Sequence, residues 1–348
     1  MTSKTFPRLL LFAFLILPGS ASAVNYTPNG EATVPSVCPR YVPSGPVSVM
    51  RNYQKIQNLV ITASGVPAIT INGFSGTQIR NVTILHEQAP GVLVENAPRT
   101  NIENVDIYNT GAPPSGAAST SDEINISCDG SPNLSVTNAR LQRGSSGIYM
   151  LNCDNSKLSK IEGHDERGPF PRGQLVQWDK SNGGSLSDFS SENSLDDSWP
   201  EDLVNIYQSH NVKIRNGYVD GDNSPSGDGI LVDQNSYQVT IQNVDAARQI
   251  NGCFGVYGGG EYNVTMTGTR CMNTVCSSVR GAPLSGSLAW AVDPNSLGRI
   301  GITSSSYVAL CNPGNIIFED DKVRPLSIRA VASMVRRKPI RAKLCSAP

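Results

Sequence analysis

The sequence predicts an all-β solenoid, in which short strands coil into a tube. Three observations support this fold class. A strand-like motif recurs along the chain, no segment inside the repeats has the apolar periodicity of a long helix, and the composition favours turns. Charged residues make up only 16% of the chain, while Gly, Ser, Asn and Thr are abundant. Such a composition is typical of proteins built from many short strands.

The recurring motif is an aliphatic residue, often an Asn two positions later, and then β-prone residues. A second short strand-like segment lies between most copies. A repeat of this length cannot bury its apolar face alone, so successive units must stack. The copies begin at Ile79, Ile102, Val136, Leu158, Leu186, Ile214 and Ile241, and the second segments at Gly91, Gly147, Leu175, Leu203 and Gly229.

Within each unit, aliphatic residues alternate with polar ones, the period expected of strands with one buried face. Stacking such turns buries the Val, Ile and Leu face inside a tube. The motif's Asn residues then share one corner, where their amides can hydrogen-bond between turns as a ladder. A β-propeller fits less well, because its blades need about 40 residues each. The expected ladder residues are Asn81, Asn104, Asn138, Asn216 and Asn243.

This pattern, over roughly residues 50 to 310, resembles the single-stranded right-handed parallel β-helix of the pectate-lyase-like superfamily. The resemblance implies a right-handed parallel β-helix (solenoid) with an N-terminal cap and a short C-terminal cap. It is more specific for fold than for chemistry, because this fold carries several activities. We expect the coil over residues 51–310, the N-terminal cap over 24–50, and the C-terminal cap and basic tail over 311–348.

Residues 1–23 differ from the rest of the chain. They have a basic start, a short apolar run and the small residues Ala21-Ser22-Ala23. This pattern predicts a secretory signal peptide cleaved near Ala23, with an N-terminal anchor as the alternative. We therefore expect a secreted or periplasmic protein. No later segment is apolar enough for a membrane span.

The end of the chain is basic. From Lys322 onward there are eight Lys or Arg and no acidic residue. Residues 326–339 could form a short amphipathic helix over the last turn, as a solvated cap or as a contact to an anionic surface. The net charge of the whole chain is −1, which argues against nucleic acid as the main partner. We expect a monomer.

The eight cysteines suggest disulfides, because an even number in an exported chain commonly pairs. No Cys-x-x-Cys or Cys/His cluster has the spacing of a structural zinc site. Cys128 and Cys153 are 25 residues apart, close to one turn of the coil, and can bridge neighbouring turns. Cys253 and Cys276, 23 residues apart, are the second candidate pair.

Aligning the copies of the motif places His164, Glu192 and Asp220 at the same position of three successive turns. Stacked strands lie about 4.8 Å apart, so we expect these side chains to form a column outside the tube. An unusual loop follows each of them, and the three loops should be neighbours. Their sequences are "HDERGPFPRG" (164–173), "ENSLDDSWPED" (192–202) and "DGDNSPSGDG" (220–229).

The second strand of each of these turns should present a polar face beside the loops, which predicts a groove along the tube. Such a groove suits a polysaccharide, because sugar hydroxyls bind Asn, Gln and Asp, and sugar rings stack on aromatic side chains. We expect Val176, Trp178, Val204, Ile206, Ile230 and Val232 to point inward. The expected outward set is Gln177, Asp179, Asn205, Tyr207, Leu231 and Asp233, with Tyr149, Tyr207 and Trp199 as stacking platforms.

The first loop contains Arg-x-Pro-x-x-Arg, from Arg167 to Arg172. This resembles a short motif of the pectate lyase family. The resemblance implies that Arg167 abstracts the proton α to a uronate carboxylate and that Arg172 binds that carboxylate. The family's Trp-Ile-Asp-His segment and its His after the second arginine are missing, and Gln177 is nearest to the latter. The structural alternative is a stiff loop in which Arg167 pairs with a neighbouring acid.

The acidic residues of the loops suggest a second chemistry. Inverting glycosidases need two carboxyl groups about 6.5–9.5 Å apart and retaining ones about 5–5.5 Å. "GDNSPSGDG" faintly resembles the Asp-rich segment of polygalacturonases, although their Asn-Thr-Asp and Gly-His-Gly motifs are absent. The same carboxylates could bind Ca²⁺, the only possible cofactor, or simply form turns. The acids are Asp196, Asp197, Asp202, Asp220, Asp222 and Asp228.

The sequence thus predicts a polysaccharide-active lyase, hydrolase or C5-epimerase acting on an acidic glycan. The alternative is a noncatalytic carbohydrate-binding or adhesive β-helix. His86 and His210 are expected to be surface or turn residues. Candidate catalytic residues are Arg167, His164, Asp197, Asp202, Asp220 and Asp222. Candidate substrate-binding residues are Arg172, Gln177, Asp179, Trp199, Asn205, Tyr207, Asp228, Asp233 and Tyr149.

Overall fold

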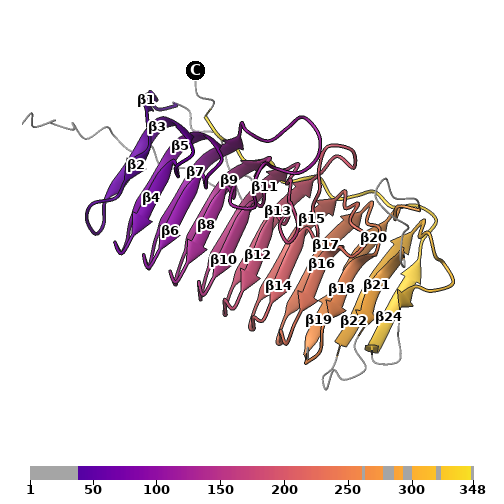
Figure 1. Ribbon diagram of the computed structural model, residues 1–348. Helices are drawn as coiled ribbons and strands as arrows, with labels where there is room; N and C mark the ends of the chain where they lie inside the picture. The colour runs from indigo at the N-terminus through magenta and orange to yellow at the C-terminus, as the bar shows by residue number, and fades with distance from the viewer. Residues whose placement is uncertain (1–37, 261–262, 277–285, 293–299, 319–322, 346–348) are drawn as a thin grey trace, which may run out of the picture.

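The computed structural model is a right-handed parallel β-helix (Figure 1). It describes residues 38–260, 263–276, 286–292, 300–318 and 323–345. Every element within these residues is a strand, and none of them forms a helix that could cross a membrane. The expected signal peptide lies outside the described residues.

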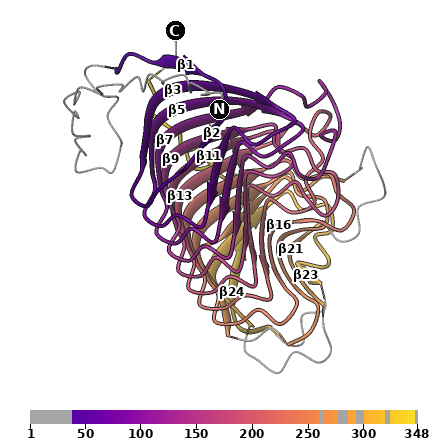
Figure 2. The same cartoon turned by 60° about the vertical axis from the view of Figure 1, so that its left-hand side comes forward.

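Each turn of the coil gives one strand to each of two sheets, and successive turns pair in parallel. Figure 2 shows the stacked turns from nearer the N-terminal end. The first sheet has 13 strands: β1 (Val42–Ser44), β3 (Lys55–Ser64), β5 (Gln78–Glu87), β7 (Asn101–Asn109), β9 (Ser135–Gln142), β11 (Lys157–His164), β13 (Ser185–Glu192), β15 (Lys213–Asp220), β17 (Thr240–Ala247), β19 (Val264–Thr267), β20 (Arg270–Met272), β22 (Ile300–Val308) and β24 (Val323–Ala330).

The second sheet has 11 strands, most of them only four residues long. Parallel pairing in the described residues therefore extends from Val42 to Ala330. The strands are β2 (Val47–Ser48), β4 (Ile69–Asn72), β6 (Val92–Glu95), β8 (Ile126–Asp129), β10 (Ile148–Leu151), β12 (Val176–Asp179), β14 (Val204–Tyr207), β16 (Asp228–Asp233), β18 (Gly252–Tyr257), β21 (Ser287–Val292) and β23 (Ile317–Phe318).

The aliphatic faces of both sheets line the interior of the tube, as the alternation predicts. One continuous apolar cluster runs from Val49 to Val323. Fully burying a side chain of this kind stabilises the fold by about 1.5–3 kcal/mol, so stacked turns stabilise one another. The six residues expected to point inward, Val176, Trp178, Val204, Ile206, Ile230 and Val232, are all fully buried.

The Asn ladder is present at the corner where each first-sheet strand bends. Nδ2 of Asn81 donates to Oδ1 of Asn58 (3.1 Å), Asn104 to Asn81 (3.1 Å), and Asn138 to Asn104 (2.7 Å). All four residues have φ between 54° and 58°, in the left-handed region that Asn tolerates better than most residues. The motif therefore encodes a bend in the strand as well as a hydrogen bond.

The ladder is interrupted in the next two turns, where Lys160 and Asp188 occupy the corner with the same left-handed φ. Asn216 donates to Oδ1 of Asp188 (3.3 Å). Asn216 thus makes the expected hydrogen bond between turns, but its side chain is exposed. The reason is that the corner lies at the surface wherever no neighbouring segment covers it.

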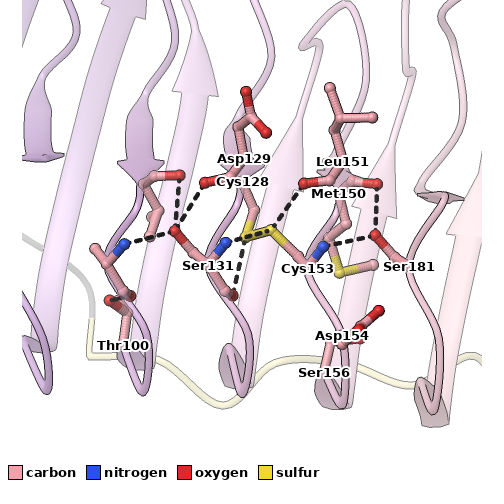
Figure 3. Close-up of a disulfide and its surroundings, with 12 residues drawn as sticks. Thr100, Cys128, Asp129, Ser131, Met150, Leu151, Cys153, Asp154, Ser156 and Ser181 are labelled. Atoms are coloured by element: carbon pink, nitrogen blue, oxygen red, sulfur yellow. Dashed lines mark hydrogen bonds between the residues drawn. A yellow bond between two sulfur atoms is a disulfide. The ribbon is translucent and has the colours of Figure 1, made fainter. Parts of the chain in front are cut away.

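A second column, of serines, forms at the corner after the second-sheet strands (Figure 3). Oγ of Ser181 accepts the backbone N–H of Cys153 (2.8 Å) and donates to the carbonyl of Met150 (3.1 Å). Cys153 takes the serine position in its own turn, and its sulfur bonds to Cys128 of β8. The structure thus contains the expected Cys128–Cys153 disulfide, with a Cα–Cα distance of 6.5 Å.

The expected Cys253–Cys276 disulfide is wrong. Cys253 bonds to Cys271, and their Cα atoms are 5.7 Å apart. Both side chains are fully buried, one from β18 and one from β20, so this bond crosses the interior between the two sheets. Cys276 lies beyond the end of β20 and bonds to Cys311. Spacing along the chain suggested a bond between neighbouring turns and could not reveal one across the tube.

The expected C-terminal helix over residues 326–339 is also wrong. Residues 323–330 form β24, which pairs with β22 and covers a strand edge that would otherwise be open. Residues 331–345, here named the C-terminal strap, then return along the outside of the first sheet to the N-terminal end (Figure 1). There Cys345 bonds to Cys38 near β1, with a Cα–Cα distance of 5.5 Å.

Replacing Asn104 tests the two roles of the ladder. Asn104→Ala removes both ladder hydrogen bonds and places Cβ of alanine at a left-handed φ, so we expect a loss of about 1–3 kcal/mol in unfolding free energy. Asn104→Gly tolerates the backbone angle and should lose less. Urea denaturation measures both. Equal, wild-type stability of the two variants would contradict a structural role for the ladder.

Candidate functional site

A pocket of about 540 Å³ opens on the outer face of the second sheet. It lies where the outward side chains of β10 to β18 meet the loops that follow β11, β13 and β15. The strands contribute Tyr149, Gln177, Asp179, Asn205, Tyr207, Leu231, Asp233 and Tyr257, and the loops contribute Phe170, Pro171, Arg172, Gln174, Glu201, Asp202 and Ser226.

The register of the second sheet arranges the pocket floor in columns. Asp179, Tyr207, Asp233 and Tyr257 are partners on four successive strands. Neighbouring strands in a sheet lie about 4.8 Å apart, so acidic and aromatic side chains alternate along the tube axis. The predicted outward set of β12, β14 and β16 is thus the set that lines the pocket. Tyr257, which the sequence reasoning missed, continues the same column by one turn.

The column of His164, Glu192 and Asp220 exists, because these residues are register partners at the ends of β11, β13 and β15. None of the three lines the pocket. Nε2 of His164 lies 2.8 Å from Oε1 of Glu162, and Asp220 binds Arg248 and Arg336. The loop residues that follow the column reach the pocket, whereas the column itself lies under the C-terminal strap. The structure therefore does not bring His164 or Asp220 to the place expected of catalytic residues.

The expectation that Arg167 is an exposed groove residue is wrong. Its side chain is buried, with the residue 2% exposed. Its guanidinium donates to the carbonyl oxygens of Gly116 (3.3 Å) and Pro114 (3.2 Å), and burial lowers its pKa. These partners belong to the long loop between β7 and β8, which covers Arg167. Arg167 consequently ties two loops together and does not line the pocket.

Arg172, in contrast, faces the pocket. Its guanidinium lies over the ring of Tyr149, 3.9 Å from the ring centroid, and donates to Oε1 of Gln177 (3.3 Å). The hydroxyl of Tyr149 donates to Oδ2 of Asp179 (2.8 Å). Burial and the hydrogen bond to Asp179 raise the pKa of Tyr149 to about 12. Arg172 is thus held by an aromatic face and an amide, with no bidentate carboxylate partner among the described residues.

Asp202 is a buried carboxyl group in the pocket wall. Its Oδ1 accepts the backbone N–H of Asp228 (2.8 Å), and its Oδ2 accepts Nδ2 of Asn205 (2.8 Å). Burial, with a further contribution from Glu201, raises the pKa of Asp202 to about 8. Burial and the charge of Asp233 raise the pKa of Glu201 to about 7. At neutral pH the pocket therefore contains a carboxylic acid that can donate a proton.

Two more carboxyl groups are buried next to Asp202. Asp222 and Asp228 are fully buried, and burial raises the pKa of each well above its ordinary range. Oδ2 of Asp222 has no hydrogen-bond partner among the described residues, and the carboxyl group of Asp228 has the backbone N–H of Gly252 beside it. Both lie close enough to Asp202 that a negative charge on Asp202 raises their pKa values further. The group is therefore stable only with most of its members protonated.

The remaining candidates lie away from the pocket. Asp196 and Trp199 are exposed on the loop after β13, and Asp197 of the same loop is half-buried on the side of Arg167. His86 is fully buried, between the carbonyl of Ala89 and the side chain of Asn125, so the expectation that it is a surface residue is wrong. Among the described residues no group of three or more His, Cys, Asp or Glu side chains is arranged to hold a metal ion.

Sequence reasoning missed Phe170, Gln174, Glu201, Ser226 and Tyr257 as pocket residues. Two of them had a signal in the sequence. Tyr257 is the register partner of Asp233 on the next strand, β18, and so continues the column of Asp179, Tyr207 and Asp233. Glu201 directly precedes Asp202, which the sequence analysis named as a candidate. Phe170 is 75% exposed between two prolines, where no periodic pattern assigns a side-chain direction.

Comparisons with known proteins agree with this architecture. Residues 67–199 match a family model described as a right handed beta helix region. Comparison with curated protein sequences finds no match. The protein is thus a right-handed parallel β-helix, the architecture that this family model describes.

Several solved structures are similar to this chain at low sequence identity. DFA-IIIase from Arthrobacter chlorophenolicus A6 is 11% identical, with a TM-score of 0.48 over 82% of this chain and 88% of that one. An endo-xylogalacturonan hydrolase from Aspergillus tubingensis is 10% identical, with a TM-score of 0.42 over 85% and 91%. The Agl-KA catalytic domain is 12% identical, with a TM-score of 0.41 over 84% of this chain. The match covers only 62% of the length of that domain's chain.

Arg167→Ala should destabilise the protein. It leaves the carbonyls of Pro114 and Gly116 without their buried donor, so we expect a loss of about 1–3 kcal/mol in unfolding free energy. Arg172→Ala is the matched control at the pocket rim and should lose about 1 kcal/mol or less. Urea denaturation of both variants checks the difference. Wild-type stability of Arg167→Ala would show that its burial adds nothing to the fold.

Asp202 should make folding stability depend on pH. Its pKa is about 8 in the folded protein, against about 3.9 for an unperturbed Asp in the unfolded chain. Between these values the folded state binds a proton that the unfolded state has released, so stability falls as pH rises. We expect Asp202→Asn to flatten this fall between about pH 5 and 8. Thermal denaturation across that range, with exposed Asp196→Asn as control, measures the slope; an unchanged slope in Asp202→Asn would contradict the assignment.

Proposed function

We propose that the protein is a glycan-active enzyme that hydrolyses a glycosidic bond in the pocket on the second sheet. The observation that carries this proposal is the position of Asp202, a carboxylic acid that stays protonated at neutral pH in the wall of an otherwise polar, aromatic-lined pocket. Glycosidases need such a group to protonate the departing oxygen of the scissile bond. The four disulfides indicate an extracytoplasmic protein, and with the predicted signal peptide we propose that it is secreted or periplasmic.

The shape and lining of the pocket suit sugar rings. Tyr207, Tyr257 and Phe170 offer aromatic faces on which pyranose rings stack, and Gln177 and Asn205 offer amides for hydroxyl groups. Aromatic and acidic residues alternate along the tube axis, and the pocket spans five strands of the sheet from β10 to β18. A linear glycan lying along the axis would contact residues from several turns at once.

The proposed chemistry divides the carboxyl groups by environment. Asp202 acts as the general acid, because burial keeps its proton in place and its side chain lines the pocket. Asp233, on the pocket floor in β16, is the candidate for the second carboxylate, which activates water or attacks the sugar directly. Asp222 and Asp228 are fully buried and do not line the pocket, so no step of the reaction is assigned to them.

The charge of the pocket favours a neutral glycan. The expectation of an acidic substrate depended on two arginines, and Arg167 does not line the pocket. Arg172 is the one cation in the lining, against the acids Asp179, Glu201 and Asp233, while Asp202 is held as a neutral acid. A polyuronate would place further negative charges beside them. An acidic glycan remains the second candidate because Arg172 could bind one carboxylate.

A screen of purified neutral glycans and polyuronates tests the proposal. New reducing ends from a neutral glycan, without the absorbance of new double bonds, are the expected result. Asp202→Asn should lower the rate by about 10²–10⁴-fold while glycan binding persists, because general acid catalysis contributes that much. Asp196→Asn, an exposed acid of the same loop that does not line the pocket, is the control and should keep wild-type turnover.

Three outcomes would contradict the proposal in whole or in part. Double-bond formation from a polyuronate would show a lyase acting on an acidic glycan. Binding of a glycan without turnover under all conditions would show a noncatalytic glycan-binding protein. Full activity of Asp202→Asn would exclude Asp202 as the acid even if hydrolysis is observed.

A further inference from the structure

The C-terminal strap crosses the outer face of the first sheet in the direction opposite to the coil. Near its start, Met334 packs on an apolar cluster of Tyr218, Ala247 and Met272 outside the tube. The backbone N–H of Arg337 then donates to Oδ2 of Asp245 (2.8 Å), and the side chain of Arg337 binds the same carboxylate (3.1 Å). The strap is therefore fixed to β17 through both its backbone and a side chain.

The strap also binds four other strands, β15, β13, β11 and β9. Arg336 donates to the hydroxyl of Tyr218 (2.7 Å) and to Oδ2 of Asp220 (3.2 Å) in β15. Arg341 binds Glu192 of β13 and Glu162 of β11. The backbone N–H of residue 342 donates to Oε2 of Glu162 (2.6 Å). At β9, Asn138 exchanges two hydrogen bonds with the backbone of residue 343, at 3.1 and 3.2 Å.

The carboxylates that the strap binds lie where the pocket loops begin. Glu192 is the last residue of β13 and Asp220 is the last residue of β15. Glu162 lies two residues before the end of β11 and binds His164, the last residue of that strand. The loops that start at these points carry Arg172, Asp202 and Ser226 into the pocket.

We infer that the C-terminal strap is a positioning element of the pocket, with Arg336 and Arg341 fixing the strand ends from which the three pocket loops start. The inference concerns the loops themselves, and only its consequence for glycan turnover rests on the proposed function. Because the strap lies on the first sheet and the pocket on the second, the strap acts through the loop origins and touches no substrate.

The strap stays ordered because it is covalently held at both ends. Its ion pairs are open to solvent on the arginine side: the side chains of Arg336 and Arg341 are 56% and 51% exposed, whereas those of their partners Asp220 and Glu162 are 4% and 5% exposed. Ion pairs with one partner open to solvent stabilise a fold by about 1 kcal/mol each, whereas ordering a residue's backbone costs about 1–2 kcal/mol. A free tail of fifteen residues (331–345) would not be held by these pairs alone. The Cys38–Cys345 disulfide therefore determines whether the strap stays on the sheet.

Hydrogen–deuterium exchange without any glycan tests the inference. In Cys38→Ser/Cys345→Ser we expect amides in residues 165–175, 193–203 and 221–227 to exchange roughly tenfold faster or more, while amides of β4, β6 and β8 keep their protection. Arg341→Ala should loosen the loops after β11 and β13, and Arg336→Ala the loop after β15. Arg341→Lys should restore part of the protection.

Two matched controls define the comparison. Lys338→Ala removes a strap cation that makes no ion pair or hydrogen bond with any residue the structure describes, and it should leave the loops unchanged. Cys276→Ser/Cys311→Ser removes another disulfide that includes an exposed cysteine and should also leave them unchanged. Wild-type exchange of the loops after the strap is released would overturn the inference. Equal loosening of every turn would also overturn it, since the strap would then be a general staple.

A glycan that the wild-type protein hydrolyses adds a second readout. Strap variants should then show a lower kcat/KM together with faster loop exchange, and Lys338→Ala should show neither. If the loops loosen as expected and no glycan is bound or hydrolysed by the wild type, the positioning role stands and the proposed function fails. If the variants turn over glycan like the wild type despite loose loops, the strap does not position the pocket.

Discussion

The parallel register between successive turns is the constraint on which the rest of the structure depends. Each strand pairs residue for residue with its equivalents in the turns before and after, so one side-chain position becomes a column along the tube. The same rule produces the apolar interior, the Asn ladder, the serine column and the pocket floor. A shift of one residue in any turn would exchange its inward and outward side chains, and the left-handed corner residues prevent such a shift by fixing where each strand bends.

The register also explains how much of the site could be predicted from the sequence. The two-residue period assigned the inward and outward residues of β12, β14 and β16, because in a strand the side-chain direction follows from position alone. The column of His164, Glu192 and Asp220 followed in the same way. What this reasoning could not supply was the direction of the loops after the column, since loop residues obey no period. The column was therefore placed at the groove, although it lies beneath the strap.

The interactions that escaped prediction join residues far apart in the sequence. Arg167 donates to carbonyls 51 and 53 residues earlier, and Arg336 reaches a carboxylate 116 residues away. A local motif such as Arg-x-Pro-x-x-Arg contains no information about these partners. The basic tail was recognised as unusual, but its cations were assigned to a helix because the acidic strand ends that bind them are spread over four turns. Long-range ion pairs of this kind become evident only when the stacked turns are seen together.

The bond between Cys38 and Cys345 has a mechanical consequence. It joins the residue that precedes the β1 region of the coil to the end of the C-terminal strap, with Cα atoms 5.5 Å apart. All turns of the coil lie between these two cysteines in the sequence. Tension applied between segments that precede Cys38 and follow Cys345 would pass through the sulfur–sulfur bond and leave the stacked turns unloaded. Force applied across the two ends of the tube would instead be shared by the strap and the parallel strands. The disulfide therefore resists tension applied to the chain ends, whereas the strap and the sheets together resist tension applied along the tube.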